Sequence, residues 1–244
     1  MTTTEDLLKL ASATIAKTYH ADWPADSFLN HEPLHTPTSA DRHASVEWHP
    51  LIPFLPSNTK VLFLGSFPPQ RKRWCMDFFY PNFINDHWRI EGLVFYNDAQ
   101  YFVESESKTF KLRSIVEHLK RYGIGFFDTA IGVRRLADNA SDKFLEVAVA
   151  TDIRAMVDHL PQLRAIVTTG EKATETITRA LNLQDEQGKI QMPKVGSFVA
   201  SPFSGIELYR LPSSSRAYPM ALTKKAEAYK KMFERYLPRE TFTC

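Results

Sequence analysis

Polar and small residues stand directly after short apolar runs in this chain. Gly65 and Ser66 follow "KVLFL", and Asp128 follows "IGFF". If these runs are strands of an open parallel sheet, the residues after them lie at the edge where such sheets bind ligands. Glycine permits close approach to the backbone, and a carboxylate accepts a hydrogen bond from a ligand N–H. We expect these three residues to contribute to one binding site. The alternative for Asp128 is a structural role, capping a helix or binding a loop amide.

The sequence "LPSSS" offers a different chemistry. Ser213, Ser214 and Ser215 follow the apolar run "GIELYRL". Hydroxyls and free backbone N–H groups in such a turn can hold a phosphate group without a net positive charge. The alternative is that the serines cap the segment that follows them.

The segment "FFYPNFINDHW" interleaves aromatic side chains with a proline and asparagines. Aromatic rings either pack in a core or stack on a flat ligand, and an amide beside them can orient a reacting molecule. We expect Phe78 and Trp88 to be core residues that anchor the segment.

The elements that must position these residues alternate between short apolar runs and amphipathic stretches. The expected strands are residues 60–66, 124–132, 163–170 and 205–211, and the expected helices are residues 110–123, 150–162, 171–182 and 222–237. Gly123 is placed to cap the first of these helices, and Thr151 to begin the second. This alternation of strands and helices predicts a three-layer α/β/α fold with a central, mostly parallel sheet of four to five strands.

Residues 1–50 and 51–244 differ in character. The start, "MTTTEDLLKLASATIAKTY", predicts an amphipathic helix and lacks the basic start and long apolar run of a signal peptide. Residues 20–49 are rich in Pro, His, Asp and Ser without a period, which predicts an extended arm packed on the domain. The histidines of this arm have no metal-ligand spacing. We expect residues 51–244 to form a single α/β domain.

Composition narrows the class of protein. The chain has 244 residues, is 43% hydrophobic and carries a formal net charge of +2, so contacts with nucleic acid would depend on local patches. Cys75 and Cys244 provide neither a disulfide framework nor a zinc site. No stretch is long and apolar enough to span a membrane. We expect a monomeric, cytoplasmic protein, nucleoid-associated if bacterial, that needs no cofactor and no metal.

Taken in order, the motifs "LGSFPP", "FFYPNFINDHW", "GIGFFDTAIGVRR", "LRAIVTTG" and "LPSSSRAY" resemble the uracil-DNA glycosylase superfamily. Within it they are most similar to the hypoxanthine-DNA glycosylase and mismatch-specific branches. The resemblance spans roughly Lys60 to Tyr218. It implies a metal-independent enzyme that flips a deaminated base (uracil, hypoxanthine or xanthine) out of DNA and hydrolyses its N-glycosidic bond.

The resemblance also implies a role for individual residues. Phe67 stands where other branches place the residue that activates water, so the catalytic group would be Asn85 of "NDHW". Phe79 and Tyr80 match the position that stacks on the flipped base. Asp128 would bind the edge of the base, beside Gly65 and Ser66 of the first loop.

The late loop and a basic run would hold the DNA backbone. Ser213, Ser214 and Ser215 match the loop that grips the backbone in the family, and Arg71 and Arg73 would extend a phosphate track. Leu211 stands where relatives with strong uracil activity have a histidine that stabilises the departing base, which implies slower removal of uracil.

Two further hypotheses remain open at this point. One is a member of the same fold that binds damaged DNA or a nucleotide and has altered or lost hydrolysis. The other is a nucleotide- or phosphate-binding enzyme with a generic doubly wound sheet, in which "TTGEKA" is the phosphate loop. "TTGEKA" lacks the glycine spacing of a Walker loop and the Lys-Ser or Lys-Thr pair that ends it, so this hypothesis ranks last.

Overall fold

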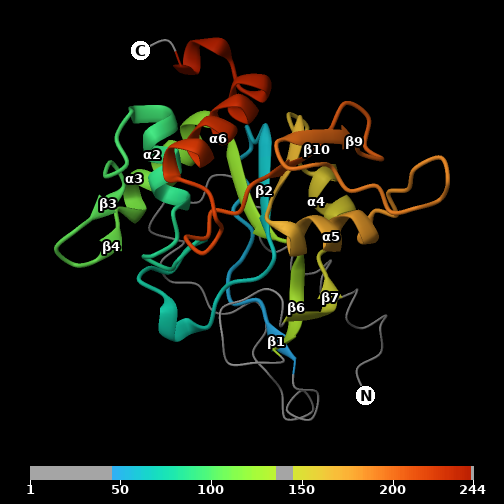
Figure 1. Ribbon diagram of the computed structural model, residues 1–244, viewed down its shortest axis with the longest axis horizontal. Helices are drawn as coiled ribbons and strands as arrows, with labels where there is room; N and C mark the ends of the chain where they lie inside the picture. The colour runs from blue at the N-terminus through green and yellow to red at the C-terminus, as the bar shows by residue number, and fades with distance from the viewer. Residues whose placement is uncertain (1–45, 136–144, 243–244) are drawn as a thin grey trace.

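A computed structural model describes residues 46–135 and 145–242 of the chain (Figure 1). The predicted N-terminal helix and almost all of the predicted arm lie outside the described residues. The last part of that arm belongs to the fold, because β1 (Glu47–Trp48) pairs antiparallel with β6 (Ala130–Arg135).

The central sheet has five strands in the order β5-β2-β8-β10-β9. They are β2 (Val61–Gly65), β5 (Ile124–Asp128), β8 (Ala165–Thr169), β9 (Ser197–Ala200) and β10 (Glu207–Leu211). The first four in the spatial order run parallel, and only β9 is antiparallel to its neighbour. Strands buried on both faces need continuous apolar runs, which is the pattern that "VLFL" and "IGFF" show.

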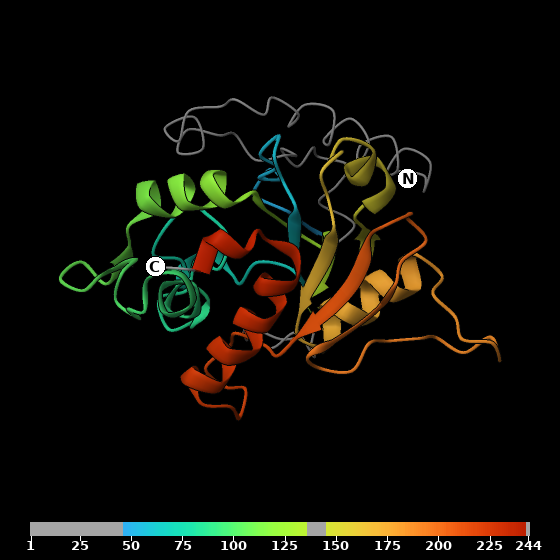
Figure 2. The same cartoon turned by 90° about the horizontal axis from the view of Figure 1, so that it is seen from above.

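Helices cover both faces of this sheet. They are α2 (His87–Tyr96), α3 (Leu112–Tyr122), α4 (Ile153–Asp158), α5 (Glu171–Ala180) and α6 (Leu222–Tyr236). Figure 2 shows α2, α3 and α6 on one side of the sheet and α4 and α5 on the other. The prediction of a three-layer α/β/α fold with a mostly parallel sheet is confirmed.

Two smaller sheets were not predicted. β6 and β7 (Leu145–Ala150) form an antiparallel three-stranded sheet with β1, in the order β1-β6-β7. A hairpin of β3 (Val103–Glu104) and β4 (Thr109–Phe110) lies in the segment between α2 and α3, and short 3-10 helices cover Arg71–Arg73 and Arg239–Phe242.

The sequence "IGFFDTAIG" looks like one strand, but it is two strands, β5 and the start of β6. The chain leaves the central sheet after Asp128, where the Thr129 N–H donates to Gly65 O at 2.8 Å.

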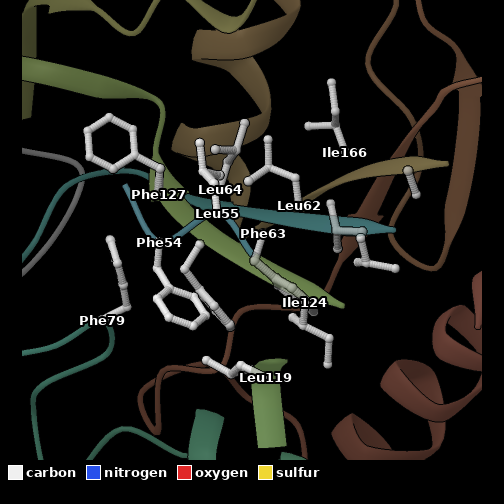
Figure 3. Packing of buried hydrophobic residues seen from close by; sticks show 14 of the residues in the cluster. Phe54, Leu55, Leu62, Phe63, Leu64, Phe79, Leu119, Ile124, Phe127 and Ile166 are labelled. Carbon is white, nitrogen blue, oxygen red and sulfur yellow. The ribbon is translucent and has the colours of Figure 1, made fainter. Parts of the chain in front are cut away.

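The core is built around the centre of the sheet. Phe63 stacks on Phe126 of the next strand, with ring centroids 5.2 Å apart and planes at 12°. Figure 3 shows Leu62 and Leu64 on the opposite side of β2 from Phe63, as expected for alternating strand side chains. Each fully buried side chain of this size contributes about 1.5–3 kcal/mol to folding. The sheet is therefore a rigid base for the residues at its carboxyl edge.

The expected helix ends were partly right. Gly123 ends α3 in the left-handed region with φ 70°, which confirms its predicted role. The prediction that Thr151 caps the next helix was wrong. Asp152 is the cap of α4 and accepts from the Ala155 N–H at 3.1 Å, while the Thr151 hydroxyl donates to Asp128 O at 2.6 Å. Both residue types favour caps, so the sequence alone does not decide between adjacent positions.

Candidate active site

Two predicted site residues at the ends of their strands meet Thr169 of a third strand at the carboxyl edge of the central sheet. Gly65 ends β2, Asp128 ends β5 and Thr169 ends β8. The Tyr80 hydroxyl reaches over this edge and lies 2.6 Å from the Thr169 hydroxyl. A Cβ atom placed on Gly65 would lie 2.3 Å from Asp128 Oδ1 and 3.8 Å from the Tyr80 hydroxyl. Glycine is therefore needed at position 65, and these groups form one cluster.

This cluster lies where the connections of the sheet change direction. β2 and β8 are neighbours, but the chain leaves β2 for the helices on one face and leaves β8 for α5 on the other face (Figure 2). Ligands of open α/β sheets bind at such a point, outside the carboxyl ends of the strands. The position favours a binding site over a packing cluster.

Tyr80 is held in an unusual conformation. Its φ is 49°, in the left-handed region that residues other than glycine seldom adopt. Its ring is parallel to that of His87, with centroids 3.8 Å apart and planes at 3°. Backbone strain of this kind costs on the order of 1–3 kcal/mol and is concentrated at functional sites. The stack and the bond to Thr169 together fix the hydroxyl over the strand ends.

Asp128 is paired with a residue that the sequence analysis passed over. Asp128 Oδ2 lies 2.9 Å from His49 Nε2, and both residues are buried. His49 Nδ1 lies 3.1 Å from Leu51 N and 2.8 Å from Leu51 O, so it can accept in the neutral ring or donate in the charged ring. In both cases Nε2 carries the proton that it donates to Asp128. The pair leaves Oδ1 as the carboxylate oxygen that faces Gly65.

The only sequence signal for this pair was general. A carboxylate at the end of a run as apolar as "IGFF" needs a partner. His49 lies 79 positions away in a segment with no period, so nothing in the sequence identified it. Its ring packs against Phe67 and Phe127, at centroid distances of 5.2 Å and 4.6 Å.

Asn85 lies at the start of α2, beside the late serine loop. Its side-chain oxygen accepts from the His87 N–H at 2.9 Å, and the next residue, Asp86, donates its N–H to Ser214 O at 3.0 Å. Asn85 is half-buried. The carbonyl oxygen keeps a second lone pair, and the described residues give the amide nitrogen no hydrogen-bond partner. The side chain thus fixes the turn that leads into α2 and still has groups free for a ligand or water.

The serine loop is fixed by a buried ion pair. Lys225 of α6 is 1% exposed, and its ammonium lies 3.1 Å from Asp86 Oδ2 and 2.8 Å from Ser215 O. Arg216 binds the other oxygen of Asp86 at 3.1 Å. A Cβ on Gly170, directly after β8, would lie 3.7 Å from the Cβ of Ser213, so the loop also reaches the strand ends.

The remaining predicted residues divide between core and surface. Phe78 and Trp88 are 1% and 0% exposed, which confirms them as core residues. Phe79 is also in the core at 3%, where its ring stacks on Phe126 at 5.8 Å, so it has no open face to offer a base. Of the two rings predicted to stack on a base, only Tyr80 lies at the cluster.

The predicted basic track lies in the first loop. Arg71 and Arg73 are exposed on the 3-10 helix after β2. Arg71 pairs with Asp77 and lies 4.4 Å from the centre of the Trp74 ring. Ser66 is half-buried after Gly65. These positions leave both arginines open to solvent, but none of their described contacts joins them to the cluster.

A buried charged group lies beneath Tyr80. Glu91 accepts from His118 Nε2 at 3.0 Å, and His118 Nδ1 lies 3.0 Å from the Tyr96 hydroxyl. His87 Nε2 is 3.5 Å from the other oxygen of Glu91, and the described residues give neither ring nitrogen of His87 a hydrogen-bond partner. Burial lowers the pKa of His87. Burial raises the pKa of Glu91, but its interactions with His118 and His87 together outweigh the effect of burial, and the net pKa is lowered.

We expect His87 and Glu91 to lower the free energy of unfolding as the pH falls. An unfolded histidine has a pKa near 6.5, so His87 binds a proton on unfolding at lower pH, and its contribution to stability declines from about pH 6.5 downward. Glu91 adds a second loss below about pH 4.3, as the pH falls toward its lowered folded pKa. The maximal slope from one proton is about 1.4 kcal/mol per pH unit.

The variant His87→Phe keeps a ring against Tyr80 and removes the titration. Urea unfolding at pH 7.5, 6.5 and 5.5 should show a steeper loss of stability for the wild type than for His87→Phe. Equal slopes for the two proteins would show that His87 does not titrate in this range.

Within residues 46–135 and 145–242, no group of three or more His, Cys, Asp or Glu side chains could hold a metal ion. The described helices include none that is long and apolar enough to cross a membrane.

The architecture is shared with a solved protein. A solution NMR structure from Methanosarcina acetivorans, described as a "putative Uracil DNA glycosylase", has a TM-score of 0.50 to this chain at 22% sequence identity. The match covers 78% of this chain and 98% of that chain. No family model matches the chain, and no curated protein is similar to it in sequence. The comparison therefore establishes a uracil-DNA-glycosylase-like fold.

Proposed function

We propose that the protein is a DNA glycosylase that hydrolyses the N-glycosidic bond of a deaminated base, of the kind removed by the hypoxanthine and mismatch-specific branches. The observation that carries the proposal is the meeting of Gly65, Asp128 and Tyr80 at the switch point of the sheet, beside Ser213. The shared fold with the Methanosarcina protein supports the same conclusion.

Asp128 is suited to bind the edge of a deaminated base. Its Oδ1 faces Gly65, and His49 holds Oδ2 at 2.9 Å. A carboxylate accepts hydrogen bonds only, and uracil, hypoxanthine and xanthine each offer a ring N–H beside a carbonyl group. The absence of a side chain at Gly65 makes room for the Asp128 carboxylate at the end of β2. The Tyr80 ring, fixed by His87 and Thr169, supplies the aromatic surface, and stacking on such a ring contributes about 1–3 kcal/mol per base.

Asn85 supplies the amide for hydrolysis. The water oxygen forms a bond to the anomeric carbon and the water loses one proton, while the bonding electrons of the N-glycosidic bond leave with the base, which takes up one proton. The second lone pair of Asn85 Oδ1 can accept a hydrogen bond from that water and orient it. The serine loop that holds Asp86 through Ser214 would carry the adjacent DNA phosphate.

A panel of oligonucleotides tests the proposal. Each carries one uracil, hypoxanthine or xanthine, in single and double strands, and alkaline cleavage reports abasic sites. We expect release of at least one of these bases in the presence of EDTA, and none from an undamaged strand. If the wild type leaves every lesion intact over a broad range of salt and pH, the enzyme assignment is wrong.

The second candidate is a binding protein with the same site and no hydrolysis. It is favoured by Phe67, which is 6% exposed and packs on His49 where a polar residue would be needed to activate water in other branches. The panel separates the two functions. The second predicts tighter binding to lesion-bearing DNA than to undamaged DNA, with no base released.

A further inference from the structure

His87, the first residue of α2, supports the Tyr80 ring from below. The two rings are parallel, with centroids 3.8 Å apart. The imidazole is fully buried, and other aromatic rings meet it at steep angles with centroids 4.9–6.0 Å away, those of Phe63, Trp88, Phe126 and Tyr229. A phenylalanine would suit such surroundings, whereas a buried imidazole loses its hydrogen bonds to water. A polar ring at this position therefore indicates a role beyond packing.

The charged and titratable groups around this ring come from several elements. β2 and β5 contribute only the apolar rings of Phe63 and Phe126. The titratable groups that face His87 are Tyr80, Glu91 of α2, His118 of α3 and Tyr229 of α6. The carboxylate of the preceding residue, Asp86, is bound by Lys225 and Arg216. Glu91 is thus the acid that is left to interact with the imidazole.

His87 and Glu91 stop just short of a hydrogen bond. His87 Nε2 lies 3.5 Å from Glu91 Oε1, and among the described residues neither of these atoms has a hydrogen-bond partner. His118 occupies the other carboxylate oxygen, Oε2, at 3.0 Å. A bond from a charged N–H to a carboxylate is about 2.7–2.9 Å long. A proton gained by His87 would therefore draw Nε2 toward Oε1 by about 0.6–0.8 Å.

Such a movement would reach the candidate site through Tyr80. The face of the His87 ring lies against the Tyr80 ring, so the imidazole cannot shift toward Glu91 without changing the stack. Tyr80 has a φ of 49°, and backbone in this region persists only where its surroundings hold it. The other contact that fixes the ring is the bond of 2.6 Å between the Tyr80 and Thr169 hydroxyls. The position of Tyr80 thus depends on the charge of His87.

We propose that His87 is a positioning residue that makes the site sensitive to pH: the neutral imidazole holds the Tyr80 ring over the strand ends, and the charged imidazole binds Glu91 and withdraws that support. The inference rests on the proposed function and adds its regulation. Burial lowers the pKa of His87, which keeps the site formed at neutral pH. Glu91 acts in the opposite direction, because its carboxylate favours the charged ring. The loss of activity therefore lies below about pH 6.5, the ordinary pKa of histidine.

The test is the rate of base release at pH 5.5 divided by the rate of the same protein at pH 7.5. The ratio of the wild type should be below one, by up to about tenfold, because a pKa no higher than 6.5 leaves at least about a tenth of the rings neutral at pH 5.5. His87→Phe keeps a ring under Tyr80 that cannot titrate, so its ratio should be at least about threefold above that of the wild type. Circular dichroism at both pH values confirms that each protein is folded.

Glu91→Gln separates this coupling from a loss of stability. The amide still accepts a bond from His118, but it no longer favours a charge on His87, so the ratio should rise as it does for His87→Phe. A variant that was merely destabilised would lose more activity in acid, and its ratio would fall. Glu117→Gln is the matched control. Glu117 is an exposed carboxylate of α3 beside His118, and its loss should leave the ratio unchanged.

A second measurement needs neither DNA nor hydrolysis. With 3-fluorotyrosine in place of tyrosine, the fluorine signal that Tyr80→Phe removes should shift as the pH falls, and should not shift in His87→Phe. Equal ratios for the wild type, His87→Phe and Glu91→Gln would overturn the inference and leave the proposed function standing. If the wild type releases no base, the proposed function fails and the fluorine titration decides the coupling: a Tyr80 signal that moves equally in the wild type and His87→Phe overturns it.

Discussion

Asn85→Ala is expected to lower the rate of base release at least about 100-fold, the usual loss when a group that orients or polarises the nucleophile is removed. DNA binding should stay within about threefold, because the serine loop, Arg216 and the Tyr80 ring are unchanged. Single-turnover release from an oligonucleotide and its dissociation constant measure the two effects separately.

The same side chain also fixes the turn before α2, so the chemical and structural roles must be separated. Loss of the hydrogen bond that the His87 N–H donates to Asn85 Oδ1 should cost about 1 kcal/mol of folding stability. Asn85→Ser keeps an accepting oxygen but lacks the amide, and should therefore be as stable as the wild type and as slow as Asn85→Ala. If Asn85→Ser is fully active, the role of the residue is structural and the nucleophile is oriented elsewhere.

The fold was predictable because the sheet is buried on both faces. Runs such as "VLFL" and "IGFF" have no polar position, so each indicates a strand in a covered parallel sheet, and helical spacing between them gives the layers. The second sheet was not predictable in the same way. β6 follows β5 after one residue, Thr129, whose N–H donates to Gly65 O of β2 and whose carbonyl accepts from the Thr151 N–H directly after β7. A long-range bond of this kind leaves no mark in the local pattern.

The candidate site residues that stand at strand ends could be predicted, because the strands themselves could be predicted. Gly65 and Asp128 were found because the carboxyl edge of a parallel sheet collects ligand-binding residues whatever the ligand is. The sequence did not decide which of two adjacent aromatic residues faces the site. Phe79 and Tyr80 are equivalent by composition, and the positive φ of Tyr80 decides which ring turns toward the site and which packs on Phe126. His49 could not be found at all, because its role depends on a contact with β5 from a segment without periodicity.

The buried ion pair holds two distant motifs of the sequence against each other. "NDHW" and "PSSS" are separated by more than 120 residues in the sequence, and Asp86 and Lys225 join them through bonds to Ser214 and Ser215. Removing one member of such a pair leaves the other charge buried without its partner, which costs about 3–5 kcal/mol.

Lys225→Met should therefore destabilise the protein by about 3 kcal/mol, the lower end of that range, since Arg216 still neutralises part of the Asp86 charge. Urea unfolding monitored by tryptophan fluorescence measures the change in free energy. Lys224→Met is the matched control. Lys224 is exposed and pairs with Glu227, so its loss should cost no more than about 0.5 kcal/mol.

A double variant decides whether the cost arises from the unpaired charge. In Asp86→Leu/Lys225→Met neither charge remains, and the backbone bond from residue 86 to Ser214 is retained, so at least about 1 kcal/mol of stability should return relative to Lys225→Met. If the double variant is less stable than the single one, the two residues stabilise the loop independently of each other.

A cost below about 1 kcal/mol for Lys225→Met would mean that the pair is not buried in solution. In that case the serine loop is not held against α2 by this contact, and its proposed hold on the DNA phosphate loses its structural basis.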